Sequence, residues 1–347
     1  MLIIENGEVY TPSPRGKATI VVAGGRIEKV GDVSAASLHA LHPEVIDASG
    51  CIVVPGLIDC HIHLLGGSGE KGFASVTPAI TAQELLAAGT TTVVGLLGTD
   101  TTTKTPPSLL AKVKALRDEG INAHMWTGGY DARSLTGNVR DDIVLIEEII
   151  GAGEIAIADR RGVHFDARSL ARLVSDCYVA GTLTGKAGVL HLHTGELPER
   201  LSIVRELLDL GVPAAALHPT HVTRNEGLFR EAVELTRRGV AVDLDVVDED
   251  LVQWLRVFDG DRSMLTISTD APIGRVGALL SQIVAAVREN VLSIEEAFAL
   301  ATRNPARVLK LRDVGEIAEG KRADLLMLDA KTLELLGVWS AGVRAQR

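Results

Sequence analysis

Short apolar runs alternate with amphipathic helical stretches through the middle of the chain, between about residues 57 and 271. Eight runs rich in aliphatic and β-branched residues have the length of buried strands: Gly56–Leu64, Thr91–Gly98, Ile121–Gly128, Gly153–Asp159, Gly188–His193, Ala214–His221, Gly239–Val246 and Met264–Asp270. Helical stretches lie between them, each followed by a glycine suited to the left-handed end of a helix: Ala82–Ala88, Ser108–Glu119, Ala167–Ala180, Glu196–Leu210 and Leu228–Arg238.

This alternation predicts an α/β protein in which eight strand–helix units close into a parallel (β/α)₈, TIM-like barrel. An open, doubly wound sheet is the competing topology, and eight consecutive units favour the barrel.

The two ends of the chain have a different pattern, with short strands separated by glycine turns. The predicted strands are Leu2–Glu5, Thr19–Val22, Arg26–Val30, Gly315–Ala318, Ala323–Leu328 and Leu333–Val338. Because neither end alone can bury a sheet face, we expect the two to pair in one small β-domain. The predicted domains are therefore a barrel at residues 54–311 and a β-domain built from residues 1–53 and 312–347.

Composition narrows the possible partners. The chain has 347 residues, is 46% hydrophobic and carries a formal charge of −10, without a run rich in Lys or Arg. These features disfavour nucleic acid and anionic membranes as partners. No apolar stretch reaches the roughly 20 residues that span a bilayer, and the start lacks the pattern of a signal peptide. With three cysteines in no zinc-binding spacing, we expect a cytoplasmic location. We also expect a homo-oligomer and a small-molecule substrate.

Histidines gather at the predicted strand ends, where barrels carry their function. His61 and His63 are two residues apart on the first strand and therefore share a face. His193 and His221 end the fifth and sixth runs, and Asp270 ends the eighth. Four strand ends that deliver imidazole and carboxylate groups to one volume predict a site for a divalent metal.

Two further histidines lie on the same runs but farther from their ends. His191 and His218 are for this reason assigned to the buried, hydrogen-bonded core rather than to the metal.

With these residues the chain resembles the amidohydrolase superfamily, whose members are (β/α)₈ metallohydrolases that commonly carry a small β-domain built from both termini. The segment Ile317–Leu325 also looks like the C-terminal β segment of that superfamily. Within it, the chain is most similar to the isoaspartyl dipeptidases. Four segments carry this similarity: Leu64–Glu70, Val94–Asp100, Thr127–Tyr130 and Pro219–Asn225.

The resemblance implies one or two Zn²⁺ ions, with other divalent metals possible, held by His61, His63, His193, His221 and Asp270. The related dipeptidases bridge two zinc ions with a carboxylated lysine on the fourth strand, and the matching position here is Glu154. A glutamate is already a carboxylate, so Glu154 is predicted as the bridging ligand; the alternative is a salt-bridged barrel residue. After Asp270 the sequence departs from the family, because the substrate-contacting serine has no match.

The predicted reaction is metal-assisted hydrolysis of an amide, in which Asp270 moves the proton and Tyr130 donates to the oxyanion. Substrate contacts are predicted at Glu70, Thr99, Arg161 and Arg224, which suit a small zwitterionic amide such as a β-aspartyl (isoaspartyl) dipeptide. A cyclic-amide or N-acyl amino acid hydrolase, a biosynthetic cyclase or condensing enzyme, and a non-catalytic metal-binding barrel remain as alternatives. A free acid–base group at Asp270 argues against the last of these.

Overall fold

Eight parallel strands and the helices between them form the larger part of the protein, in a computed structural model that describes residues 1–67, 69, 71–247 and 250–346. The strands are β6 (Leu57–Ile62), β7 (Thr90–Gly95), β8 (Asn122–Thr127), β9 (Ile149–Ile157), β10 (Val189–Thr194), β11 (Leu217–Thr220), β12 (Val242–Asp245) and β13 (Leu265–Ser268). Each predicted run overlaps one of them, which confirms the eight strands.

The strands follow one another in chain order. β6 to β11 form one parallel sheet, and β12 pairs with β13, also in parallel. β12 lies beside β11, and β13 lies beside β6. At this last contact the Asp270 amide donates to the His61 carbonyl oxygen at 3.1 Å, and the His63 amide donates to the Ala271 carbonyl oxygen at 2.8 Å. The last strand of the series is thus joined to the first.

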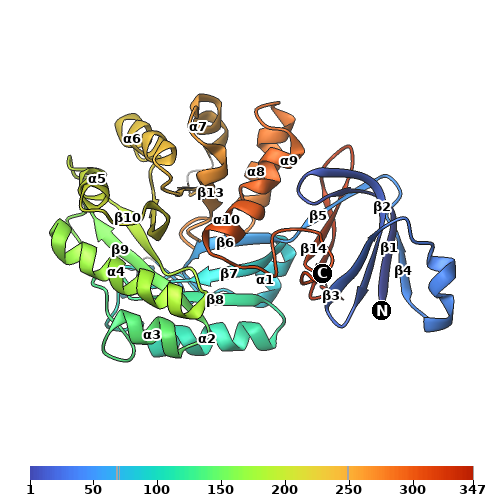
Figure 1. Cartoon of the computed structure of the whole chain (residues 1–347), viewed down its shortest axis with the longest axis horizontal. Helices are drawn as coiled ribbons and strands as arrows, with labels where there is room; N and C mark the ends of the chain where they lie inside the picture. Colours follow the sequence, from blue (N-terminus) through green and yellow to red (C-terminus); the bar gives the residue numbers. More distant parts are fainter. Residues whose placement is uncertain (68, 70, 248–249, 347) are drawn as a thin grey trace.

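Helices cover both sides of these strands (Figure 1). They are α1 (Ala82–Ala87), α2 (Pro106–Asp118), α3 (Val139–Leu145), α4 (Ala167–Thr184), α5 (Ser202–Asp209), α6 (Glu226–Arg237), α7 (Leu251–Val257), α8 (Ala278–Arg288), α9 (Ile294–Ala299) and α10 (Arg303–Val308), with 3₁₀ turns at η1 (Ala35–Leu41), η2 (Phe73–Ser75), η3 (Ala214–Ala216) and η4 (Arg262–Met264). Side-chain caps such as Thr81 and Asp166 satisfy free amides where α1 and α4 begin. Aliphatic side chains fill the space between strands and helices.

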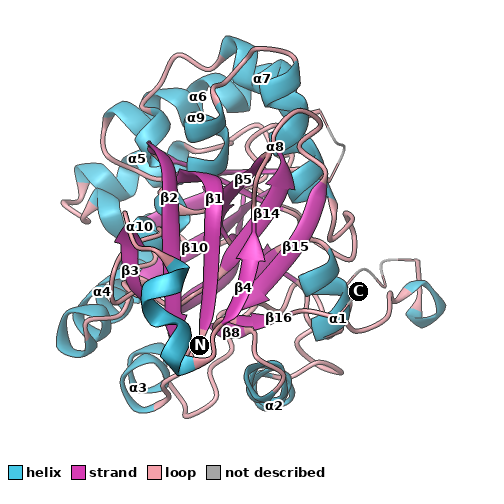
Figure 2. Ribbon diagram, turned by 90° about the vertical axis from the view of Figure 1, so that its right-hand side faces the viewer, coloured by secondary structure: helices cyan, strands magenta, loops and turns pink. Residues whose placement is uncertain are grey.

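Strands from both ends of the chain share one sheet, as predicted; Figure 2 shows this sheet facing the viewer. It contains β1 (Leu2–Tyr10), β2 (Pro14–Ala23), β3 (Arg26–Gly31), β4 (Glu44–Asp47), β5 (Cys51–Pro55), β14 (Leu325–Asp329), β15 (Leu335–Ser340) and β16 (Val343–Arg344). The two ends meet where β14 pairs antiparallel with β5. Side chains of this sheet, among them Ile20 and Trp339, form an apolar cluster separate from that of the larger part.

Two glycines explain where the predicted boundaries of β9 and α4 are wrong. β9 begins at Ile149, four residues before the predicted start at Gly153. Gly153 lies inside the strand. The position needs glycine because a Cβ there would lie 2.7 Å from the His191 Cβ. α4 continues past Gly181 to Thr184, since Gly181 serves close packing: its Cβ would lie 2.6 Å from the Gly188 Cα.

Two other predicted elements also differ. The stretch Glu196–Leu210 is helical only from Ser202 onward. Gly315–Ala318 is not a strand, because Gly315 adopts φ +85° and a Cβ there would lie 2.6 Å from the Ala306 Cβ on α10. In the described ranges, every helix is too short or too polar to cross a membrane.

Candidate active site

A cavity of about 340 Å³ opens where the parallel strands reach their carboxyl ends. It is lined by five of the predicted metal ligands: His63, Glu154, His193, His221 and Asp270. The sixth, His61, is fully buried beside them. They come from β6, β9 and β10 and from positions one or two residues after β6, β11 and β13. The structure therefore brings together all six predicted ligands.

Glu154 lies at the centre of this group. Its Oε2 is 2.9 Å from the His193 Nδ1, 3.6 Å from the His221 Nε2 and 3.7 Å from the His61 Nε2. Its Oε1 is 3.7 Å from the His63 Nε2. Side chains alternate along β9: Ile155 and Ile157 face the apolar core, while Glu154 faces the histidines. One carboxylate thus reaches histidines from three other strands.

Asp270 joins the histidines of β6. Its Oδ1 is 3.2 Å from the His61 Nε2 and 3.1 Å from the His63 Nε2. Asp270 and His221 both adopt left-handed backbone conformations, with φ of 51° and 58°. Non-glycine residues seldom take such conformations, and they are concentrated at functional sites. Both residues lie just beyond a strand end, where the turn brings them to the cavity.

Electrostatics keeps both carboxyl groups ionised. Burial raises the pKa of Glu154, but the neighbouring His61 and His193 outweigh it and hold that pKa well below its usual range. Burial likewise raises the pKa of Asp270, and hydrogen bonds with His61 and His63 lower it on balance. Burial lowers the pKa of His221, but Asp245 and Glu154 raise it to about 10. At neutral pH the His221 imidazole therefore carries a proton, which a metal ion bound there would displace.

The donor set fits divalent metal. Three buried triads have ligand atoms within 4.8 Å of one another: His61, His63 and Glu154; Glu154, His193 and His221; and His61, His221 and Asp270. Imidazole nitrogens and carboxylate oxygens are ligands of zinc and of other first-row metals. Because two of the triads share Glu154, the residues suit one ion or a pair of ions with this carboxylate between them.

Two aspartates that the sequence analysis missed hold histidines of the site from outside. The Asp245 Oδ2 is 2.6 Å from the His221 Nδ1, and the Asp159 Oδ2 is 3.2 Å from the His193 Nε2. Such partners orient metal-ligating imidazoles. A signal for Asp245 was present, because Asp243 and Asp245 sit at alternating positions at the end of the seventh run. Strand alternation would put Asp159 on the face of β9 opposite Glu154, but the strand ends at Ile157 and the chain then turns.

The predicted substrate contacts line the wall of the same cavity where the structure describes them. Thr99, Arg161 and Arg224 lie there together with Lys104, which the sequence analysis did not select. Glu70 lies outside the described residues. The Arg224 guanidinium is 3.6 Å from Glu196.

Tyr130 and Arg161 lie beside His193. The Tyr130 hydroxyl is 2.9 Å from the His193 Nδ1, and the Arg161 guanidinium stacks over the Tyr130 ring at 5.5 Å from its centre. Arg161 also donates to Asp159 through two nitrogens, at 2.9 and 2.6 Å. Burial raises the pKa of the Tyr130 phenol well above its usual value, so Tyr130 is a neutral donor.

The chain is similar to known proteins over most of its length. A dihydroorotase of Lactobacillus gasseri is 25% identical over 94% of this chain and 88% of its own length. An adenine deaminase of Deinococcus radiodurans is 28% identical over 97% of this chain, which spans 60% of that protein. The crystal structure of a beta-aspartyl dipeptidase from Fervidobacterium islandicum AW-1, in complex with the beta-Asp-Leu dipeptide, superposes with a TM-score of 0.93 and 33% identity, over 99% of this chain and 96% of that one.

The sequence model of the amidohydrolase family matches residues 52–344, which is most of the chain. This match confirms the resemblance drawn from the histidine pattern. The chain belongs to the amidohydrolase family.

Proposed function

We propose that this protein is a zinc-dependent hydrolase that cleaves the amide bond of a small zwitterionic substrate, a β-aspartyl dipeptide. The observation that carries the proposal is the placement of Glu154 between two pairs of histidines, at a cavity that Asp270 also lines. The similarity to a beta-aspartyl dipeptidase over nearly the full length of both chains supports the choice of substrate.

The metal ligands, Asp270 and Tyr130 would each have a separate role in the hydrolysis. Metal bound by the triads would polarise the substrate carbonyl and lower the pKa of water from 15.7 toward about 7. Asp270, with its lowered pKa, is ionised and can accept the proton of the attacking water and pass it to the leaving nitrogen. Tyr130 keeps its proton and can donate a hydrogen bond to the oxyanion as it forms.

Charges on the cavity wall suit the two carboxylates of a β-aspartyl dipeptide. Lys104, Arg161 and Arg224 are the cationic residues among those that line the described cavity. Arginine can bind a carboxylate through two nitrogens. Of the predicted substrate contacts, Glu70 is assigned to the substrate ammonium and Thr99 to a polar contact.

A cyclic-amide hydrolase is the second candidate. It is favoured by the similarity to a dihydroorotase over most of both chains, although at lower identity than the similarity to the dipeptidase. The same metal ligands and Asp270 would serve either reaction, so the residues that line the cavity wall would decide between a dipeptide and a cyclic amide as substrate.

The proposal includes the surrounding architecture. The eight strands would close as a (β/α)₈ barrel, with the terminal sheet as a small β-domain and boundaries near residues 53 and 311. Contacts of β13 with β6 and of β12 with β11 support closure. The cytoplasmic location and the homo-oligomeric state remain predictions.

A substrate panel tests the function. Zinc-loaded protein should hydrolyse β-Asp-Leu with a kcat/KM at least about 10²-fold above that for α-Asp-Leu, dihydroorotate, hydantoin, an N-acetyl amino acid and adenine. α-Asp-Leu is the matched control because it has the same atoms and charges but a different linkage. Hydrolysis of dihydroorotate or hydantoin with no activity on β-Asp-Leu would contradict the dipeptidase assignment and favour the cyclic-amide alternative.

A further inference from the structure

We propose that His191, His218 and Thr266 form a hydrogen-bonded chain that links His61 to the buried Asp243 and fixes the proton of His61 on its Nδ1. His61 Nε2 is thereby left with its lone pair for the metal. This inference rests on the proposed metal centre and assigns a positioning role to residues outside it.

The hydrogen-bonded chain is continuous in the structure. The His61 Nδ1 is 2.7 Å from the His191 Nε2, and the His191 Nδ1 is 3.0 Å from the His218 Nδ1. The His218 Nε2 is 2.9 Å from the Thr266 hydroxyl, which donates to Asp243 Oδ1 at 2.7 Å. All five residues have an exposed fraction of 0%. They contact one another directly and come from β6, β10, β11, β13 and β12.

Asp243 fixes the direction of every proton in the chain. Its two oxygens accept from the hydroxyls of Thr220, Ser268 and Thr266 and from the thiol of Cys60. Because a carboxylate only accepts hydrogen bonds, the Thr266 hydroxyl must donate its proton to Asp243. Its oxygen is then an acceptor for a proton on the His218 Nε2.

The same reasoning carries through the three rings. A neutral imidazole has one donor and one acceptor nitrogen. With its proton on Nε2, His218 accepts at Nδ1 from the His191 Nδ1. His191 then accepts at Nε2 from the His61 Nδ1. The remaining nitrogen of His61, Nε2, faces Asp270 and Glu154 at 3.2 and 3.7 Å, on the side of the metal triads.

Packing holds the middle of the chain in place. The Trp126 indole stacks on the His191 ring, with centres 5.2 Å apart and an angle of 11° between the planes. Its Nε1 donates to the Cys60 carbonyl oxygen at 3.0 Å. The His191 ring is thus held in the plane that lets it bond His61 on one side and His218 on the other.

The other histidines of the site suggest why such a chain is useful. Asp245 bonds His221 and Asp159 bonds His193 directly. A carboxylate that bonds the distal nitrogen of a metal-ligating histidine orients the ring, and its loss typically costs about 10- to 100-fold in metal affinity. For His61 the carboxylate is Asp243, reached through three intervening side chains.

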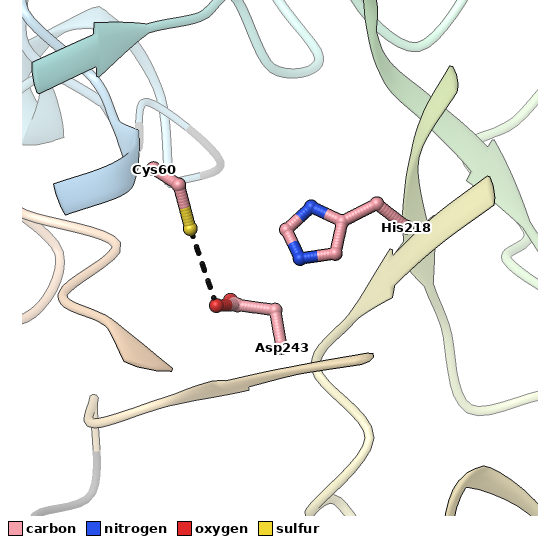
Figure 3. A group of neighbouring side chains, drawn as sticks. All are labelled: Cys60, His218 and Asp243. Carbon is pink, nitrogen blue, oxygen red and sulfur yellow. Dashed lines mark hydrogen bonds between the residues drawn. The ribbon is translucent and has the colours of Figure 1, made fainter. Parts of the chain in front are cut away.

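Part of this chain also has the composition of a metal site. Cys60, His218 and Asp243 converge from three strands (Figure 3), with ligand atoms within 4.8 Å of one another. A ligating imidazole needs a free lone pair, whereas the chain places a proton on the His218 Nε2. The Cys60 thiol likewise lies 3.3 Å from Asp243 as a donor. The hydrogen-bonded chain and a metal ion on Cys60 and His218 therefore exclude each other.

Thr266→Val and Thr266→Ser form a matched pair for the test. Valine has the shape of threonine but cannot accept from His218, so the protons can reverse along the chain and place one on the His61 Nε2, where it competes with metal. Serine keeps the hydroxyl. Thr90→Val, which removes a buried hydroxyl on β7 outside the chain, is the control for the loss of a hydroxyl.

Zinc affinity and stoichiometry, measured by competition with a chelator, are the readout. We expect two equivalents in the wild type, and in Thr266→Val one of them bound about 10- to 100-fold more weakly, with Thr266→Ser and Thr90→Val close to wild type. His191→Phe, whose ring can still stack on Trp126, should weaken the same equivalent.

Three outcomes would overturn the inference. Unchanged zinc affinity in both Thr266→Val and His191→Phe would refute the hydrogen-bonded chain but not the proposed metal centre. A third zinc equivalent that disappears in Cys60→Ser would show that Cys60, His218 and Asp243 hold a metal instead. A wild type that binds no zinc would refute the proposed metal centre and the chain with it.

Discussion

Replacing Glu154 by glutamine should remove at least one of two bound metal ions. The substitution keeps the shape of the side chain and removes its charge. Oε2 of Glu154 lies 2.9 to 3.7 Å from nitrogens of three histidines, and Oε1 lies 3.7 Å from a fourth. His61 and His63 would retain Asp270 as a carboxylate partner, whereas His193 and His221 would lose the carboxylate of their triad. The ion at His193 and His221 should therefore be lost first.

The magnitude follows from the charge that is removed. Two unit charges about 4 Å apart interact by about 4 kcal/mol at an effective dielectric constant of about 20. A divalent ion in direct contact with the carboxylate would lose more, so 4 kcal/mol is a lower figure for the Coulomb interaction. It corresponds to roughly a thousandfold weaker binding at the His193 and His221 triad.

Metal content after dialysis, measured by mass spectrometry, is the assay. Glu148→Gln is the matched control, because Glu148 is also buried and carries the same charge but pairs with Lys114, at 2.6 Å, instead of the histidines. Wild type and Glu148→Gln should each hold two equivalents, and Glu154→Gln at most one. Loading of the wild type should be the same with and without bicarbonate, because Glu154 needs no carboxylation. Two equivalents in Glu154→Gln with wild-type affinity would refute the bridging role.

Three further predictions concern proton transfer, the oxyanion and acid stability. Asp270→Asn should reduce kcat on the order of 10²-fold or more while metal stays at His193 and His221; steady-state rates with metal analysis check this, and a near-normal rate would point to another base. Tyr130→Phe should lower kcat by about 10²- to 10³-fold with metal content unchanged, and an unchanged kcat would exclude Tyr130 as the donor. Burial lowers the pKa of His124 to about 3. Below about pH 6.5 the unfolded chain therefore binds a proton at His124 that the folded chain does not bind. The free energy of unfolding should fall by up to about 1.4 kcal/mol for each pH unit between pH 6.5 and 3. His124→Gln should flatten that part of the urea-denaturation profile, and an identical slope in the variant would contradict the assignment.

The sequence predicted the eight strands and the convergence of the candidate metal ligands because both have strong local signals. Each strand is a short apolar run, and four histidines and Asp270 lie at or just beyond the ends of such runs. Parallel strands bring those ends to one side of the molecule, so position along the chain is enough to predict convergence. The assignment of His191 and His218 to the buried core is also confirmed, since both are fully buried and hydrogen-bonded.

Among the outer partners of the histidines, Asp245 had a signal in the sequence, whereas Asp159 and Asp243 did not have one that pointed to this role. Strand alternation would place Asp159 on the face away from the site, but it assumes that the strand continues, and Ala158 instead adopts φ 49°. The chain from His61 to Asp243 depends on how three imidazole rings are turned, and residue spacing carries no information about ring orientation. Gly153 and Gly181 predicted boundaries because glycine often ends an element, but here each allows a close approach of neighbouring backbone or side chains.

Titration of metal-free protein with zinc, followed by the initial rate of β-Asp-Leu hydrolysis, tests the central claim most directly. If Glu154 joins two pairs of histidines into one hydrolytic centre, the metal-free protein should be inactive and the rate should rise with added zinc until about two equivalents are bound. Full activity in the metal-free protein, or zinc that binds without any hydrolysis of the dipeptide, would contradict the account.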